Sequence, residues 1–275
     1  MNLNWLESIV YGLFAGLADI LPVSAQAHKT LLLKVFGTRG NTELLDLLIH
    51  LALVAALYRA CRSTFVRMSR ARRLSLTPKK KRKRPLDVRS LMDLSMLRTM
   101  LIPVLLGLFL YRKAADLRGN LILLTVFLFV NGLILYIPQF LPSGNRDSRT
   151  LSRVEGLLMG LGGTVSVVPG ISAVGAMTSI GSVCGVERTY CLDLALMANL
   201  FLNAGFVVFD IMAIVENGAG KLSAVILVQY LVSALTAFLG TALGIRVLRR
   251  LSGYAGFGFY CFGLALFIFI LNLIV

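Results

Sequence analysis

The chain has 275 residues, of which 57% are hydrophobic and 15% are charged, and its net charge is +15. A soluble domain carries about a quarter charged residues, so this composition excludes an ordinary soluble protein and indicates one that is embedded in lipid. Apolar runs recur along the whole length, which predicts a single membrane domain over residues 1–275. The four cysteines are scattered without paired spacing, which argues against both a disulfide framework and a zinc site.

The first half of the chain begins with an unusual apolar stretch at 5–24. It is rich in glycine, is broken by Pro22 and carries small polar residues near that proline. Broken helices inside a bilayer are tolerated only where their backbone is buried or lines a cavity, so this stretch is predicted to be a re-entrant helical hairpin. Apolar runs at 44–58, 97–111 and 121–141 follow, and each is predicted to be a transmembrane helix.

The segment at 59–98 lies between the first two of these runs and holds 14 Lys or Arg residues, including an unbroken basic run at 79–84. Such a run on its own is typical of a nuclear import signal or a nucleic-acid-binding patch. Between two membrane helices it is better explained as a cytoplasmic loop that fixes the topology and contacts anionic lipid headgroups. We therefore predict contact with anionic membrane lipids and no nucleic-acid partner.

The second half repeats the order of the first. A glycine-rich stretch at 156–183, broken by Pro169, is predicted to be a second re-entrant hairpin. Runs at 192–215, 222–247 and 254–275 are predicted to be three further transmembrane helices. The expected fold class is thus an all-α polytopic membrane protein with six transmembrane helices and two re-entrant hairpins.

The basic residues indicate how the two halves are oriented. If the segment at 59–98 is cytoplasmic, the six spans place 21 of the 28 Lys and Arg residues on the cytoplasmic side, in agreement with the usual excess of basic residues on that face. The same assignment places the C-terminus outside. The hairpins then enter from opposite faces, which predicts an inverted-topology repeat with repeat 1 at about 1–141 and repeat 2 at about 154–275. Such repeats place their site between the broken helices, near the midplane.

A short echo supports this interpretation, because GLFAGL at 12–17 in the first hairpin matches GLLMGL at 156–161 in the second. Ionisable residues inside membrane segments mark functional sites by default, and Asp19 and His28 flank the first proline turn. Small polar residues also surround both turns, and they are Ser24, Gln26, Ser166, Ser172, Thr178 and Ser179.

Four further polar residues have simpler alternatives. Asp46 and His50 are one helical turn apart on the first span and share a face, but an interfacial acid and a helix-packing hydrogen bond explain them equally well. Asn199 and Asn203 are interpreted as residues that join neighbouring helices by hydrogen bonds.

The two proline turns resemble the motifs of a known family. Residues 15–28, AGLADILPVSAQAH, are similar to the first signature of the undecaprenyl-diphosphate phosphatase (bacitracin-resistance) family, E-G-L-T-E-F-L-P-V-S-S-T-G-H. Residues 169–176, PGISAVGA, are similar to its second signature, P-G-x-S-R-S-G-A. Further similarity covers nearly the whole chain, and the family's fold also has two re-entrant hairpins and six spans.

The resemblance implies a bacterial inner-membrane enzyme that hydrolyses the polyprenyl (undecaprenyl) diphosphate carrier of cell-wall synthesis to its monophosphate. It also implies a divalent cation, Mg²⁺ or Ca²⁺, with Asp19 as the candidate metal ligand. The catalytic residues that it implies are Asp19, Ser24 and His28. The phosphate-binding residues are Gln26, Gly170 and Ser172.

Three motif positions depart from the family pattern: Ala15 replaces the first glutamate, Ala25 the second serine and Ala173 the arginine. An arginine that stabilises phosphoryl transfer contributes about 10³ to 10⁵ in rate, so these losses bear directly on catalysis. Arg188 or Lys29 could supply the missing positive charge. Two hypotheses stay open, namely a diphosphatase with a rearranged site and a non-hydrolytic transporter or carrier-binding protein for a polyprenyl phosphate.

Overall fold

The computed structural model describes residues 3–38, 40–82, 84–115, 117, 119–219 and 222–274. Within these ranges the chain is helical, and six helices are long and apolar enough to cross a membrane. Their agreement with the predicted runs confirms the fold class, an all-α multi-pass membrane protein.

Each half of the chain forms a hairpin of two short helices followed by three long ones. The first half consists of α1 (Trp5–Ile20), α2 (Ala25–Val35), α3 (Glu43–Leu76), η1 (Lys79–Lys81), α4 (Val88–Leu108), the short α5 (Tyr111–Ala115), α6 (Leu121–Tyr136) and η2 (Ile137–Phe140). The second consists of α7 (Arg153–Val165), α8 (Ala173–Val183), α9 (Arg188–Asn217), α10 (Ala224–Arg250) and α11 (Ala255–Ile274). The first hairpin is longer than predicted, since its returning arm α2 continues beyond residue 24 to Val35.

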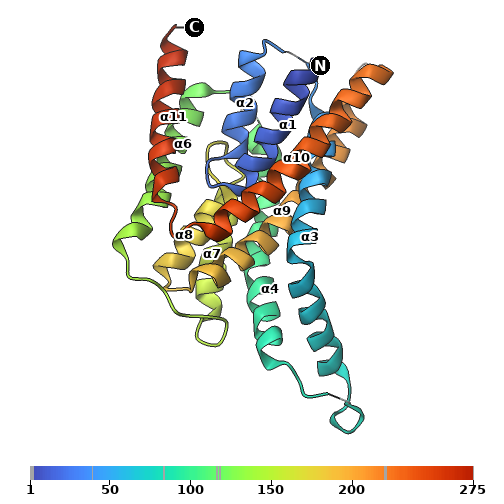
Figure 1. Ribbon diagram of the computed structural model, residues 1–275, viewed down its shortest axis with the longest axis vertical. Coiled ribbons are helices and arrows are strands. Elements are labelled where there is room, and N and C mark those ends of the chain that lie inside the picture. Colours follow the sequence, from blue (N-terminus) through green and yellow to red (C-terminus); the bar gives the residue numbers. More distant parts are fainter. Residues whose placement is uncertain are drawn as a thin grey trace.

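The two hairpins enter the molecule from opposite ends, as Figure 1 shows for α1 and α2 above and α7 and α8 below. Both entering arms begin with a capping box, in which a polar N-cap and a glutamate three residues later satisfy each other's backbone amides. In α1 the pair is Asn4 and Glu7, and in α7 it is Ser152 and Glu155. The same start signal therefore opens both hairpins.

The two halves are interlocked rather than side by side. The entering arm α1 packs along α10 of the second half, and α7 packs along α4 of the first, while α3 pairs with α9 and α6 with α11. The GLxxGL echo explains these contacts. A Cβ atom at Gly16 would overlap the carbonyl oxygen of Ala237 on α10, and one at Gly160 would overlap the carbonyl oxygen of Met100 on α4. Glycine thus lets the backbones approach closely at matching positions of both halves.

The basic segment at 59–98 is not the loop that the sequence analysis predicted. Helix α3 continues through it to Leu76, and α4 begins at Val88, with Asp87 capping its first turn. Arginine, leucine and methionine are good helix formers, and buried Met68 and Met96 provide apolar packing for this extension. The apolar residues of this segment recur at helical spacing, and the segment therefore forms helix in spite of its high charge.

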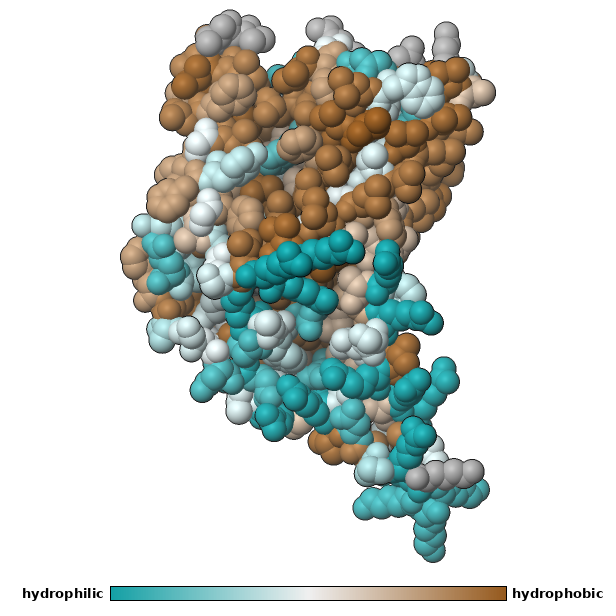
Figure 2. All heavy atoms as spheres, in the orientation of Figure 1, coloured by the Kyte–Doolittle hydropathy of each residue, from teal (hydrophilic) through white to brown (hydrophobic). Residues whose placement is uncertain are grey.

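The extension carries most of the basic residues of this segment away from the apolar body. At about 1.5 Å per residue, the 34 residues of α3 span about 51 Å, which exceeds the roughly 30 Å of a bilayer core by about 20 Å. Figure 2 shows the apolar belt in the upper part and the hydrophilic projection below it. The predicted contact with anionic headgroups stays a prediction.

Candidate functional site

The tips of the two hairpins meet at the side chain of Asn131, which is fully buried on α6. Its amide nitrogen donates to the carbonyl oxygen of Pro22 over 3.1 Å, and its amide oxygen accepts from the backbone amide of Ser172 over 2.9 Å. One side chain therefore satisfies a backbone group in each proline turn. This contact brings the two motif segments together, as the inverted-repeat interpretation requires.

Both returning arms begin at a serine that was predicted as a site residue. The Ser24 hydroxyl accepts from the amide of Ala27 at the start of α2, and the Ser172 hydroxyl accepts from the amide of Gly175 at the start of α8. Ser24 has a φ of 65°, which is rare outside glycine and reflects the sharp reversal after Pro22. The first turns of α2 and α8 consequently point into the space between the hairpins.

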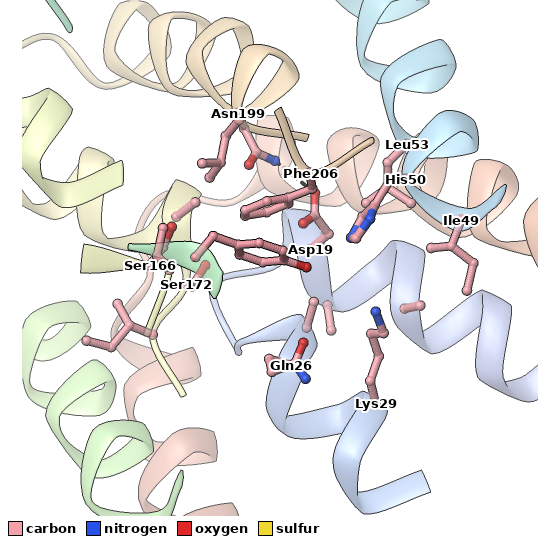
Figure 3. Close-up of a pocket in the computed structure, with 18 residues that line it drawn as sticks. Asp19, Gln26, Lys29, Ile49, His50, Leu53, Ser166, Ser172, Asn199 and Phe206 are labelled. Atoms are coloured by element: carbon pink, nitrogen blue, oxygen red, sulfur yellow. Dashed lines mark hydrogen bonds between the residues drawn. The ribbon is translucent and has the colours of Figure 1, made fainter. Parts of the chain in front are cut away.

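A small cavity of about 70 Å³ lies in that space (Figure 3). Its wall includes both motif segments, together with side chains from α3, α5 and α9. The polar residues on the wall are Asp19, Gln26, Lys29, His50, Tyr111, Ser166, Ser172 and Asn199. All three alanines that replace family residues, Ala15, Ala25 and Ala173, line the same cavity.

Asp19 is held by two amides from the facing helix α9. The side-chain nitrogens of Asn199 and Asn203 lie 2.8 Å and 3.3 Å from its Oδ2 atom. Both asparagines are fully buried, and Asn203 also donates to the carbonyl oxygen of Asn199. These contacts fix the carboxylate at the cavity wall, and they show that Asn199 is a cavity residue as well as a helix-packing one.

Lys29 is the basic side chain of this cavity. It is buried, and its ammonium group pairs with Asp46 on α3, whose other carboxylate oxygen accepts a 2.8 Å hydrogen bond from Thr42. Lys29 and Gln26 also line a second and larger cavity of about 700 Å³, which extends toward the end of the molecule where α2 and α3 are joined. We call this larger space the vestibule. It adjoins the Asp19 cavity at Lys29.

His50 forms a buried pair with an acid that is distant in sequence. Its Nδ1 atom lies 2.6 Å from Oδ2 of Asp210 on α9, and both side chains are about nine-tenths buried. The His50 ring also packs at a tilt on Phe206, another residue of the cavity wall. In Figure 3, His50 and Lys29 approach Asp19 from neighbouring elements.

The structure brings some of the predicted site residues together and separates others. Asp19, Gln26 and Ser172 line the cavity, whereas Ser24 and Gly170 belong to the turns behind it.

His28 faces away, into an apolar groove beside α11. Its Nδ1 atom contacts the carbonyl oxygen of Ser24 over 2.9 Å, and its Nε2 atom contacts the hydroxyl of Tyr260 over 2.7 Å. Both ring nitrogens are therefore engaged outside the cavity. Arg188, one of the two proposed cations, also lies elsewhere, against Tyr254.

Sequence reasoning missed two residues that organise the site. Asn131 is one of few polar residues in the apolar run at 121–141, and its isolation there was the available signal. Asp210 is an acid in the middle of the run at 192–215, which the same rule on intramembrane ionisable residues would have selected. Neither could be paired with its partner without the three-dimensional arrangement.

The divalent cation stays a prediction, because the side chains around Asp19 would supply only part of its ligands and the substrate phosphates would have to supply the others. Mg²⁺ and Ca²⁺ prefer several oxygen ligands, but the carboxylate of Asp19 is contacted by amide nitrogens, and the neighbouring motif position is Ala15. In the part of the chain that the structure describes, no group of three His, Cys, Asp or Glu side chains is arranged to hold a metal. The positive charge nearest the site is supplied by Lys29.

Comparison with known proteins identifies the family. A family model described as Bacitracin resistance protein BacA matches residues 8–267. The chain is 27% identical to the undecaprenyl-diphosphatase of Methanobrevibacter smithii over 200 residues, which cover 71% of this chain and 72% of that protein. It is 24% identical to the undecaprenyl-diphosphatase of Carboxydothermus hydrogenoformans over 249 residues, which cover 90% of this chain and 89% of that protein. It is also 24% identical to undecaprenyl-diphosphatase 1 of Shouchella clausii over 278 residues, which cover 98% of this chain and 96% of that protein. The chain therefore belongs to the bacitracin resistance protein BacA family.

Proposed function

We propose that this protein binds a polyprenyl diphosphate lipid with its headgroup between the two hairpin tips and hydrolyses it as an undecaprenyl-diphosphatase. The observation that carries the proposal is the convergence of both motif segments on one cavity, with Ala15, Ala25 and Ala173 all on its wall. The two motifs that carry the resemblance thus meet at one site, and several relatives of this chain are named undecaprenyl-diphosphatase.

The electrostatics of the tips favour an anionic headgroup. Residues of the first turns of α2 and α8 line the cavity, and the N-terminus of a helix presents free backbone amides and a positive dipole end. Broken helices in inverted-repeat membrane proteins use such ends to hold anionic groups at mid-membrane. Lys29 adds a full positive charge at the boundary between cavity and vestibule.

The available space indicates how the headgroup enters. A cavity of about 70 Å³ holds about two water molecules, at roughly 30 Å³ each, and is too small for a whole diphosphate. The vestibule of about 700 Å³ provides the remaining room. In this proposal the terminal phosphate reaches the cavity and the rest of the headgroup stays in the vestibule, where Lys29 exchanges its pairing with Asp46 for the phosphates.

We further propose a location in the bacterial inner membrane with the basic projection in the cytoplasm and the C-terminus outside. Most Lys and Arg residues lie at the end of the molecule that carries the α3–α4 projection, in line with the positive-inside rule. The vestibule opens toward the opposite end, so the lipid headgroup would be hydrolysed at the outer face.

A second function, non-hydrolytic transport or binding of a polyprenyl phosphate, is favoured by one specific observation. The cavity has methyl groups at the three positions where the family signatures supply a glutamate, a serine and an arginine. Inverted-repeat scaffolds with broken helices also suit alternating access. The two functions share the same headgroup site, and they differ in whether phosphate is released.

The decisive experiment measures phosphate release from undecaprenyl diphosphate by the purified full-length protein, with and without added Mg²⁺ or Ca²⁺. Lipid binding is measured on the same preparations. The diphosphatase proposal predicts release by the native chain and a faster rate in the combined variant Ala15→Glu, Ala25→Ser, Ala173→Arg. A native chain that binds the lipid and releases no phosphate, but gains release in the combined variant, would favour the transport or binding function.

Lys29→Met tests the headgroup site itself, because it removes the cavity's ammonium group while keeping a side chain of similar length. We expect lipid affinity to fall by at least tenfold, since a hydrogen bond to a charged group contributes about 1.5 to 3 kcal/mol. Lys113→Met is the matched control, because Lys113 is an exposed lysine outside the cavity wall. Equal affinities in the two variants would contradict the assignment of Lys29 to the phosphates.

A further inference from the structure

The pair formed by His50 and Asp210 has the geometry of a proton acceptor and its orienting acid. Asp210 accepts at Nδ1 of the ring over 2.6 Å, so the neutral imidazole carries its proton on Nδ1 and has a free lone pair on Nε2. The imidazole is held from a second side by Phe206, which itself stacks on Tyr111. Packing and the carboxylate together fix the ring against the cavity.

The charged and titratable groups around this ring come from several packed elements. They are Asp19 on α1, Lys29 on α2, Asp46 on the preceding turn of α3, Tyr111 on α5 and Asp210 on α9. Asp46 is occupied by Lys29 and Thr42, and Asp19 is occupied by two asparagine amides. Across the described part of the chain, His50 is hydrogen-bonded at Nδ1 alone, so its Nε2 atom is the base that this group of residues offers to the cavity.

The cavity lacks an activated side-chain nucleophile at the motif position, because Ala25 replaces the second serine of the signature. Its two serine hydroxyls are engaged locally: Ser166 donates to the carbonyl oxygen of Gly163 over 2.6 Å, and Ser172 caps α8. Among the hydrogen bonds of the described residues, none joins either hydroxyl to His50. The cavity does have room for about two water molecules.

We infer that His50, oriented by Asp210, is the general base that activates a water molecule for attack on the terminal phosphorus of the bound diphosphate. This inference rests on the proposed function. The water oxygen forms the new bond to phosphorus while Nε2 of His50 accepts its proton. The bridging P–O bond breaks, and its electron pair leaves with the polyprenyl monophosphate. The proton then passes from His50 to the released inorganic phosphate. Asp210 is a positioning residue, since it acts through His50.

The alternative is that the pair is purely structural and joins α3 to α9. A buried ion pair is weak evidence for stability, because desolvation of both charges offsets much of their attraction. The two roles differ in their dependence on pH. A general base loses activity as it becomes protonated, so the rate falls on the acidic side, whereas a structural pair has no such effect on the rate of the folded fraction.

The test measures initial rates of phosphate release from undecaprenyl diphosphate across acidic and neutral pH. We expect His50→Gln to lower the rate by about 10² to 10⁴, the usual contribution of a general base, and to remove the acidic decline that the native chain shows. Asp210→Asn should also lower the rate, and Asp210→Glu should partly restore it. Lipid binding by each variant shows that the folded cavity persists.

Asp193→Asn is the matched control for Asp210→Asn, because Asp193 lies on the same helix but pairs with Arg249 at the surface. We expect this variant to keep the native rate and pH profile. Two results would overturn the inference and leave the proposed function intact. In the first, the native chain hydrolyses the lipid, and His50→Gln keeps both the native rate and its decline at acidic pH. In the second, His28→Gln loses activity and His50→Gln does not. A native chain that binds the lipid without releasing phosphate would overturn both.

Discussion

The side chain of Asn131 joins the two hairpin tips by hydrogen bonds, and Asn131→Ala tests this junction. This substitution removes the side-chain amide that pairs with the carbonyl oxygen of Pro22 and with the backbone amide of Ser172 in a buried environment, and it leaves the Pro22 oxygen with only the weak contact of the Cys261 thiol over 3.8 Å. An unsatisfied buried backbone group costs about 1 to 3 kcal/mol, so the two together predict a loss of about 2 to 6 kcal/mol in the free energy of unfolding. Lipid binding should weaken as well, because the two tips then lose the contact that sets the cavity.

The assay is unfolding of the detergent-solubilised protein by titration with SDS. Asn131→Asp keeps the acceptor for Ser172 but places a buried carboxylate oxygen against the carbonyl oxygen of Pro22, so it should be at least as destabilising as Asn131→Ala. Thr125→Val is the control on the same helix, because the Thr125 hydroxyl donates only within α6, to the carbonyl oxygen of Leu121. If Asn131→Ala unfolds within about 0.5 kcal/mol of the control, the range of an inconspicuous substitution, the junction does not hold the hairpins together.

Three further predictions concern packing, pH and topology. Gly16→Leu and Gly160→Leu should each destabilise the protein by about several kcal/mol in the SDS titration, because each new side chain would meet a backbone carbonyl group. Gly253→Leu is the control and should be tolerated, since nothing lies within 4 Å of its Cβ position. At the polar end of α7, Arg146 holds the pKa of Glu155 at about 2. Because folding lowers this pKa, the ionised Glu155 stabilises the folded protein at pH values above the ordinary carboxyl pKa, and this stabilisation is lost as the pH falls toward 2. Thermal unfolding should therefore show a loss of stability at acidic pH in the native protein that is absent in Glu155→Gln. A cysteine introduced at Lys80 should react with a membrane-impermeant maleimide only after the cytoplasmic face is exposed; reaction in intact cells would reverse the proposed orientation.

The sequence was sufficient for the fold because each helix leaves a strong local signal. The six apolar runs and the two proline-broken, glycine-rich stretches identify the spans and hairpins, and the capping boxes at Asn4 and Ser152 mark where the hairpins begin. The α3–α4 projection is less evident from the sequence, because the high charge of this segment is also typical of a solvated loop. Buried Met68 and Met96 show that one face of this basic segment is still apolar.

The site was only partly predictable, for a geometric reason. The motifs contain Asp19, Gln26 and Ser172, which line one cavity, but motif spacing does not show which way each side chain points. His28 follows the same turn as Gln26, yet it faces Tyr260 and not the cavity. The pairs Lys29–Asp46 and His50–Asp210 join helices that are far apart in sequence, so they are visible only once α2, α3 and α9 are packed.

The account's central claim, that both hairpin tips form one site for the diphosphate headgroup, is tested most directly by filling that site from either hairpin. Binding of radiolabelled undecaprenyl diphosphate should be measured for Ala25→Leu and Ala173→Leu, whose side chains would enter the cavity from opposite hairpins. Ala55→Leu is the control, because Ala55 is exposed on α3 and lies outside the cavity wall. Both cavity variants should lose lipid binding, and the control should keep it. Native affinity in either cavity variant would contradict the claim.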